Sequence, residues 1–209
     1  AMTMSATSRP AQMRAEYSGV PLRAIAQLAK SWNFSEASFG MAALNSYYAT
    51  PSVADEHGFA LADAPWPQIF DPFRNAVAGK KVAVIGHFPF APKALNQAAD
   101  FYMLERSLNE GDYPDSAAEY ILPECDYVFI TGSAFVNKTA PRLLELSRES
   151  FNVVLGPSTP LAPVLVEDYG VSQVTGMVPT SPLAMFEGLS GTDAGTTMFD
   201  WGHRVELSA

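Results

Sequence analysis

Residues 82–85 form an unbroken apolar run, Val-Ala-Val-Ile, between polar residues 79–81 and an abrupt stop at Gly86. Such a run is typical of a strand buried on both faces of a parallel sheet. Because apolar runs alternate with helix-like patterns after it, we expect the first, central strand of a doubly wound α/β sheet here. Ligands of such sheets bind beyond the carboxyl ends of the strands, which places Gly86, His87 and Phe88 at the mouth of a site.

Before this strand, apolar positions recur at helical spacing in two places. Residues 21–29 open with a proline and predict one helix, and residues 35–49 predict a second. Residues 3–7 fit a short strand. Residues 50–79 contain four prolines and several aromatic residues, so we interpret them as a long, irregular connection that packs onto the sheet.

After the central strand, helical and strand patterns alternate. A capping-box pair, Ser116 and Glu119, predicts the start of one of the helices. We expect helices over residues 91–100, 116–123, 139–150 and 162–168, and strands over residues 101–104, 126–131, 151–155 and 171–175, with an edge strand at 203–207.

Composition narrows the class of protein and its partners. The 209 residues are 48% hydrophobic and 17% charged, which is typical of a globular protein with a real core. The net charge of -9, without a basic run, argues against nucleic acid and anionic membranes as partners. No stretch is long and apolar enough for a membrane span, and no signal sequence is present, so we expect a cytoplasmic protein. Cys125, the single cysteine, excludes an internal disulfide.

Small polar residues follow three of the predicted strands. They are Gly86, Thr131, Gly132, Ser133, Gly156, Ser158 and Thr159. The carboxyl ends of parallel strands lie side by side, and helix N-termini there favour anions, so the three loops indicate a small polar or anionic ligand. Helix capping and chain turning are the alternative roles, for Ser133 and Thr159 in particular.

His87 and Glu105 are the strongest candidates for chemistry. His87 fits a general acid or base, or equally a loop histidine bonded to the backbone. Glu105 lies nineteen residues after Gly86, near the spacing at which an acidic residue meets a ribose; a surface pair with Arg106 is its alternative. The residues after Gly86 are bulky where a second glycine would admit a pyrophosphate. This argues against NAD or FAD bound in the usual way and leaves an adenosyl or pterin-like group open.

Further polar residues have a common structural role as their alternative. Asp112 and Asp115 fit the lining of a pocket or a turn and a helix cap, with the cap favoured for Asp115. Lys138 fits a charge near the third strand end or an exposed lysine. Asn33 and Glu36 stand beside a helix start, where capping and interaction with the helix dipole are the usual roles.

The sequence resembles the heavy-metal chelation domain family, a family of unknown function. The matching segments span residues 19–178 and are residues 19–23 (Gly-Val-Pro-Leu-Arg), 30–33 (Lys-Ser-Trp-Asn), 36–37 (Glu-Ala), 79–89 (Gly-Lys-Lys-Val-Ala-Val-Ile-Gly-His-Phe-Pro), Glu105, 111–114 (Gly-Asp-Tyr-Pro), 122–126 (Leu-Pro-Glu-Cys-Asp), 137–139 (Asn-Lys-Thr), 141–145 (Pro-Arg-Leu-Leu-Glu) and 156–163 (Gly-Pro-Ser-Thr-Pro-Leu-Ala-Pro).

This resemblance implies two parts with a site between them. Residues 1–75 would hold a small α+β part like the enolase N-terminal domain, together with a connector. Residues 76–209 would form a Rossmann-like domain with some likeness to methyltransferases. Members of the family have some tens of further residues before the first segment, so we expect the enolase-like part to be incomplete here. Asn137, within a matching segment, joins the candidate ligand-binding residues.

The resemblance implies an enzyme that condenses or hydrolyses a flavin-, pterin- or siderophore-like molecule in the interdomain cleft, in support of heavy-metal handling, with His87 as acid or base. The three histidines are far apart in sequence, so binding a metal complex or making a chelator fits better than direct chelation. A non-catalytic protein that binds a small molecule or metal complex is the alternative. An exposed sheet edge also makes a homodimer an expectation, and the cofactor stays unassigned.

Overall fold

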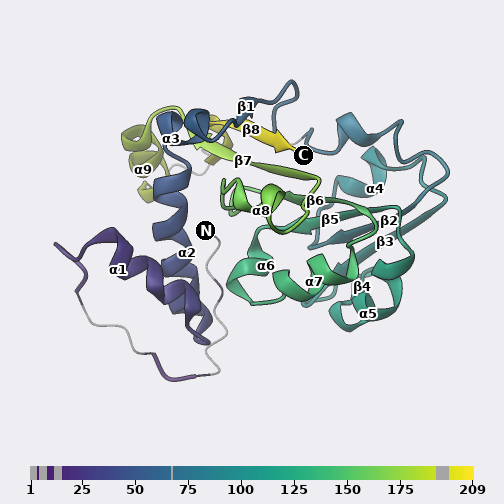
Figure 1. Ribbon diagram of the computed structural model, residues 1–209, viewed down its shortest axis with the longest axis horizontal. Helices are drawn as coiled ribbons and strands as arrows, with labels where there is room; N and C mark the ends of the chain where they lie inside the picture. The colour runs from purple at the N-terminus through teal and green to yellow at the C-terminus, as the bar shows by residue number, and fades with distance from the viewer. Residues whose placement is uncertain (1–3, 5–8, 12–15, 67, 192–197) are drawn as a thin grey trace.

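An eight-stranded, mostly parallel sheet organises the molecule (Figure 1). The computed structural model describes residues 4, 9–11, 16–66, 68–191 and 198–209. The strands, in chain order, are β1 (Ala60–Leu61), β2 (Lys81–Ile85), β3 (Asp100–Glu105), β4 (Tyr113–Pro114), β5 (Tyr127–Thr131), β6 (Phe151–Leu155), β7 (Gln173–Pro179) and β8 (Gly202–Ser208). Their order in space is β1-β8-β7-β6-β5-β2-β3-β4. Strand β8 pairs in the antiparallel sense with both β7 and β1, and the other neighbouring strands pair in parallel.

Short helices connect these strands, and the longest helix, α2, precedes them. The α-helices are α1 (Leu22–Ala26), α2 (Phe34–Tyr48), α3 (Pro51–Glu56), α4 (Ala91–Ala94), α5 (Ala118–Ile121), α6 (Ser133–Val136), α7 (Ala140–Leu146), α8 (Val164–Glu167) and α9 (Pro182–Ser190). The 3-10 helices are η1 (Gln27–Lys30), η2 (Asp71–Phe73), η3 (Asp115–Ala117), η4 (Leu122–Glu124) and η5 (Met198–Trp201). None of the described helices is long and apolar enough to cross a membrane.

The central position of β2 explains its unbroken apolar sequence. It lies between β3 and β5, and Val82, Ala83 and Val84 are all fully buried. Ala83 faces the core that includes helices α5 to α8, whereas Val82 and Val84 face a second core, with η2 and α4, on the opposite side of the sheet. The predicted central strand is therefore confirmed, because both of its faces are covered.

The connection before β2 packs down as predicted and also supplies a strand. Phe70 and Phe73 are buried, and both rings lie edge-on to Phe129 of β5 at centroid distances of 5.2 and 5.0 Å. Residues 60–61 of the connection pair with β8 at one edge of the sheet. The C-terminal strand β8 is therefore paired with a strand on each side, β1 and β7, which corrects its expected position at the edge of the sheet.

Several element boundaries differ from the sequence-based expectations. The predicted helix at 91–100 ends at Ala94, since the chain must turn to let Ala99 N donate to the Lys80 carbonyl and enter β3. The predicted capping box is wrong. Ser116 lies inside η3, and α5 begins two residues later without a side-chain cap. The helix predicted over 139–150 ends at Leu146. The strand expected over residues 3–7 lies, apart from Met4, outside the described residues.

The N-terminal helices stand to one side of the sheet (Figure 1). Helix α2 packs so closely on η1 that a Cβ added to Gly40 would lie 1.9 Å from the backbone nitrogen of Ala29. Ala37 and Met41 of α2 share a small core with Val136 of α6, and Ala29 of η1 packs against the same core. Among described residues 4, 9–11 and 16–59 there is no strand, so the described part of this segment is helical.

The buried thiol of Cys125 gives a first test of the core. Burial raises the pKa of Cys125 to about 11, from an ordinary value of 9.0. At pH 8 the reactive thiolate is therefore about 100-fold less populated than in a free cysteine. We expect iodoacetamide to alkylate native Cys125 at least about 100-fold more slowly than the guanidine-unfolded chain, as followed by mass spectrometry. Similar rates in the two states would contradict this packing.

Candidate functional site

A cavity of about 910 Å³ lies between α2 and the carboxyl ends of the parallel strands. Four successive strand ends, those of β2, β3, β5 and β6, contribute to its lining. Nine of the polar residues and glycines that the sequence singled out lie there, namely Gly86, His87, Glu105, Asp115, Thr131, Ser133, Asn137, Gly156 and Ser158. Parallel strands bring these residues together because their carboxyl ends meet at the same edge of the sheet.

Glycines allow the loops at this edge to approach one another. A Cβ added to Gly132 would lie 2.4 Å from the backbone nitrogen of Thr159, so the loops after β5 and β6 lock together there. Gly86 has a φ of 105°, and a Cβ added there would lie 3.2 Å from the Thr131 side chain. A side chain at either glycine would push apart the loops that form the floor of the cavity.

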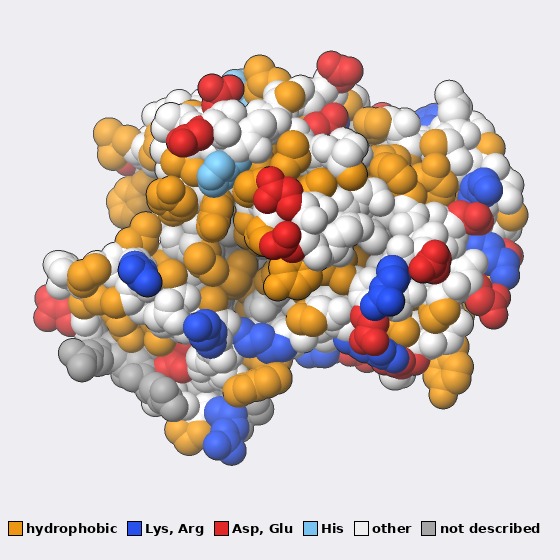
Figure 2. Space-filling model, viewed as in Figure 1, with side chains coloured by type: hydrophobic (Ala, Val, Ile, Leu, Met, Phe, Trp, Pro, Cys, Tyr) orange, Lys and Arg blue, Asp and Glu red, His pale blue; other side chains and the backbone are white. Residues whose placement is uncertain are grey.

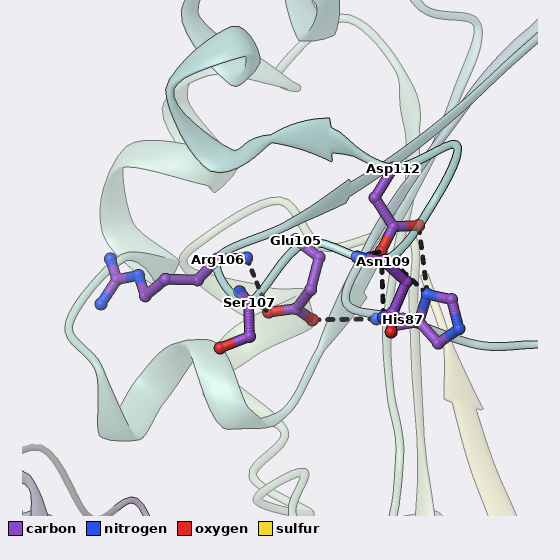
Figure 3. A network of polar contacts seen from close by, with 6 residues as sticks. All are labelled: His87, Glu105, Arg106, Ser107, Asn109 and Asp112. Carbon is purple, nitrogen blue, oxygen red and sulfur yellow. Dashed lines mark hydrogen bonds and ion pairs between the residues drawn. The ribbon is translucent and has the colours of Figure 1, made fainter.

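His87 and Asp112 form a hydrogen-bonded pair beside the cavity (Figure 3). The Nδ1 atom of His87 lies 3.0 Å from Asp112 Oδ2, and the Asp112 side chain is completely buried while that of His87 is 30% exposed. A carboxylate at Nδ1 holds the proton on that nitrogen and leaves Nε2 free to accept one. His87 is therefore oriented as a proton acceptor, with Asp112 behind it.

The ionised form of Asp112 is favoured by its hydrogen bonds. Burial alone would raise its pKa, but hydrogen bonds from the Asn109 backbone and side chain and from His87 bring the pKa below its ordinary value. The Asn109 N–H donates to Oδ2 at 3.0 Å, and the Asn109 side-chain amide donates at 3.2 Å. Asp112 is thus a carboxylate throughout the neutral range.

Glu105 joins the loops that follow β2 and β3 (Figure 3). Its Oε2 accepts a hydrogen bond from the His87 N–H at 2.9 Å, and its Oε1 accepts from the N–H groups of Arg106 and Ser107. The alternative role of Glu105, a side-chain pair with Arg106, is not observed; the Arg106 guanidinium binds Asp115 at 2.9 Å instead. Asp115 lines the cavity and does not cap a helix, which corrects the role favoured for it.

The other candidate residues lie outside the cavity lining. They are Asn33, Glu36, Asp112, Gly132, Lys138 and Thr159. Asn33 caps α2, since its side-chain oxygen accepts from the N–H groups of Ser35 and Glu36. Glu36 is fully buried and accepts a 2.5 Å hydrogen bond from the Ser31 hydroxyl.

Lys138 connects the sheet domain to the N-terminal helices. It adopts a φ of 68°, and its ammonium group donates to the backbone carbonyl of Ala29 in η1. It is partly buried, so the expectation of an exposed lysine is wrong. The ammonium is held away from the cavity, and Lys138 is not among the lining residues.

Sequence reasoning missed the contribution of α2. Ala42, Asn45 and Ser46 of α2 line the cavity together with Ala49, which follows the helix. The Asn45 side-chain amide donates to the Ser158 carbonyl at 2.9 Å. The available signal was an asparagine late in an otherwise apolar helix face, where this residue type is a poor helix former. Its partner lies 113 residues away in the sequence, so only the tertiary structure identifies it.

Metal ligands do not gather in the described part of the chain. No group of three or more His, Cys, Asp or Glu side chains among those residues could hold a metal ion. Cys125 is buried near the start of β5, at the edge of the sheet opposite to the cavity. The donor set of the described cavity residues therefore does not fit a directly bound heavy metal, and we derive no metal-dependent step from it.

Known sequences and structures resemble most of this chain. A family described as "Putative heavy-metal chelation" matches residues 68–205, and a second with the same description matches residues 1–48. An uncharacterized protein of Methanocaldococcus jannaschii is 29% identical over 101 residues, which are 46% of this chain and only 39% of that protein. The chain therefore matches about two fifths of the length of that curated relative.

Two crystal structures have the same fold. A protein with unknown function from Desulfitobacterium hafniense, from the family that matches residues 68–205, superimposes with a TM-score of 0.83 and 45% identity, covering 91% of this chain and 76% of that one. A protein of Pyrococcus horikoshii, also of unknown function, gives a TM-score of 0.75 at 23% identity, covering 97% and 80%. The second likeness shows the fold alone.

The close approach at Gly132 gives a test of how the cavity floor is built. Gly132 has an ordinary helical φ of -57°, so only lack of space opposes Gly132→Ala. We expect a loss of about 3 kcal/mol in the free energy of unfolding by urea, because backbone atoms of the neighbouring loop must move.

Gly79→Ala is the matched control. Gly79 has a φ of 70° and no atom within 4 Å of an added Cβ, so only backbone strain opposes the change. We expect a loss of about 1 kcal/mol there. A smaller loss at Gly132 than at Gly79 would contradict the interlocked loops.

Proposed function

This chain belongs to the family described as "Putative heavy-metal chelation", and from that premise we propose that it is an enzyme acting on a small molecule in the cavity between α2 and the sheet. The chemistry is general acid–base catalysis of a condensation or hydrolysis. The substrates are flavin-, pterin- or siderophore-like molecules, which would connect the reaction to heavy-metal handling through a chelator.

The pair formed by His87 and Asp112 carries this proposal. A neutral imidazole that lines a cavity, with Nδ1 held at 3.0 Å by a buried carboxylate, is arranged to accept a proton at Nε2. The carboxylate also stabilises the imidazolium that forms, in the way that an orienting acid supports a catalytic histidine. Hydrolysis and condensation both need a proton removed from an attacking water or hydroxyl, and His87 supplies that step.

The strand order supports a Rossmann-like assignment for the sheet domain. Counted in chain order from β2, the parallel strands are arranged 3-2-1-4-5-6, which is the order of doubly wound dinucleotide-binding folds. From β2 the chain first adds strands on one side (β3, β4) and then on the other (β5, β6, β7). Ligands of such sheets bind in the crevice where this change of side occurs, between β2 and β5. We propose the division expected from the sequence, with residues 76–209 as this domain and residues 1–75 as an enolase-like part and connector.

Glu105 weighs against adenosylmethionine as the ligand. Its two carboxylate oxygens already accept three backbone N–H groups from the loops after β2 and β3. A ribose would have to compete with these bonds or share the remaining lone pairs. A homodimer through a sheet edge stays a prediction, and the strands at both edges, β1 and β4, are only two residues long.

Native mass spectrometry of freshly purified protein tests catalysis against simple binding. We expect a retained organic molecule whose mass changes during incubation with the wild type and stays constant with His87→Gln. A molecule retained unchanged by both proteins would favour the non-catalytic binding protein. Metal analysis of the same sample shows whether that molecule carries a metal.

Substitutions of the pair test the acid–base role directly. We expect His87→Gln and Asp112→Asn each to reduce turnover of the retained molecule by about 100-fold or more, since positioned acid–base groups contribute this much. The melting temperature of His87→Gln should change by less than about 4 °C, because the partly exposed His87 side chain loses only its hydrogen bond to Asp112. His203→Gln, an exposed histidine on β8, is the control and should keep full turnover. A large fall in melting temperature with His87→Gln would assign His87 a structural role.

A further inference from the structure

The geometry points to the class of ligand that this cavity accepts: a largely apolar molecule without an acidic group that presents an N–H donor to Asn45. An aromatic amine is the simplest member of this class. The inference deepens the proposed function, since it concerns the same cavity, but it rests on contacts that are independent of His87.

Asn45 provides a buried acceptor that has no partner. Asn45 is only 9% exposed, and its side-chain amide nitrogen already donates to the Ser158 carbonyl at 2.9 Å. Its Oδ1 atom is buried and finds no hydrogen-bond partner among the described residues, although Asn45 lines the cavity. Because an unpaired buried acceptor is costly, a ligand with an N–H at this point would be favoured.

The charges around the cavity disfavour an anion. Its charged lining residues in the described chain are Glu105, Asp115 and Arg106, besides the ionisable His87. The Arg106 guanidinium is neutralised by Asp115, with Nε 2.9 Å from Oδ2, so the charge of Glu105 has no balancing cation there. This contrasts with the anionic ligand that polar loops and helix N-termini suggested from sequence.

Helix α2 adds to this preference. Asn45 and Ser46 lie in its C-terminal turns, where the helix dipole carries a partial negative charge. The last turn contains no basic residue that would offset the dipole. A protonated or polarised N–H at this end of the cavity therefore gains from the dipole as well as from the Asn45 acceptor.

Most of the remaining wall is apolar and adaptable. Met177 of β7 and Met185 and Phe186 of α9 line the cavity, and Phe88 lines it beside His87. Flexible methionine side chains fit irregular apolar and aromatic surfaces well. Hydrophobic side chains also gather over α9, at the upper left of Figure 2. An aromatic body would be held by these residues while its N–H meets Asn45.

Two indole compounds of similar shape and opposite charge test this inference. Titration calorimetry would compare tryptamine, a cationic amine, with indole-3-acetate, an anion. We expect tryptamine to bind at least about 10-fold more tightly, as one charge-assisted hydrogen bond allows. Equal affinities, tighter binding of indole-3-acetate, or binding of neither compound at millimolar concentration would each overturn the inference.

Asn45→Leu tests the acceptor, because leucine has nearly the same shape and cannot accept a hydrogen bond. We expect tryptamine affinity to fall about 10- to 150-fold, the range for a hydrogen bond to a charged group. Tyr47→Phe is the control on the same helix, because the Tyr47 side chain is exposed and does not line the cavity. It should keep tryptamine affinity within about 2-fold. Unchanged affinity in Asn45→Leu would contradict the assigned donor position.

Binding by His87→Gln separates this inference from the proposed enzyme. Asn45 and His87 are contributed by α2 and by the loop after β2, so tryptamine should bind this variant within about 3-fold of the wild type. If the wild type prefers tryptamine but turns over no retained molecule, the proposed enzymatic function is wrong and the inferred ligand class stands. If the wild type turns over a retained acidic molecule, the enzymatic function stands and the inferred ligand class is wrong.

Discussion

Burial of β2 on both faces is the constraint on which the rest of the structure depends. Val82 and Val84 are fully buried on one side of the sheet and Ala83 on the other, and each fully buried valine contributes about 1.5–3 kcal/mol. A strand covered on both sides needs parallel neighbours with helices between them. The carboxyl ends of the parallel strands then lie on the same side of the sheet. Strands β3 and β5 flank β2 on opposite sides, and the cavity lies beyond the carboxyl ends of these three strands.

A polar contact between distant segments completes this cavity. The Asn45 amide bond to the Ser158 carbonyl and the Lys138 bond to the Ala29 carbonyl connect the N-terminal helices with the loops of the sheet. Both bonds end on backbone carbonyls, so they fix the position of a helix without requiring a particular partner side chain. The cavity therefore depends on how the two parts are held together as much as on either part.

Glycines and carboxylates have different structural roles at the site. Gly86 and Gly132 let backbones approach closely, and the carboxylates of Glu105 and Asp112 satisfy N–H groups and orient the ring of His87. The two carboxylates take up the Nδ1 atom and the backbone N–H of His87. The proposed proton transfer uses the remaining ring nitrogen, Nε2, and the proposed ligand class rests on the unpartnered Asn45 oxygen.

The sequence by itself determined the parallel sheet, its central strand and the set of loops at one edge, because periodicity and turn residues report burial along a strand. It placed His87, Glu105 and Ser133 beside one another through the geometry of parallel strands alone. Only the tertiary structure decided that Asp112 stands behind His87, that Arg106 pairs with Asp115, and which helix covers the cavity. These contacts join residues from different secondary-structure elements and loops, where side-chain direction and packing, rather than local pattern, select the partner.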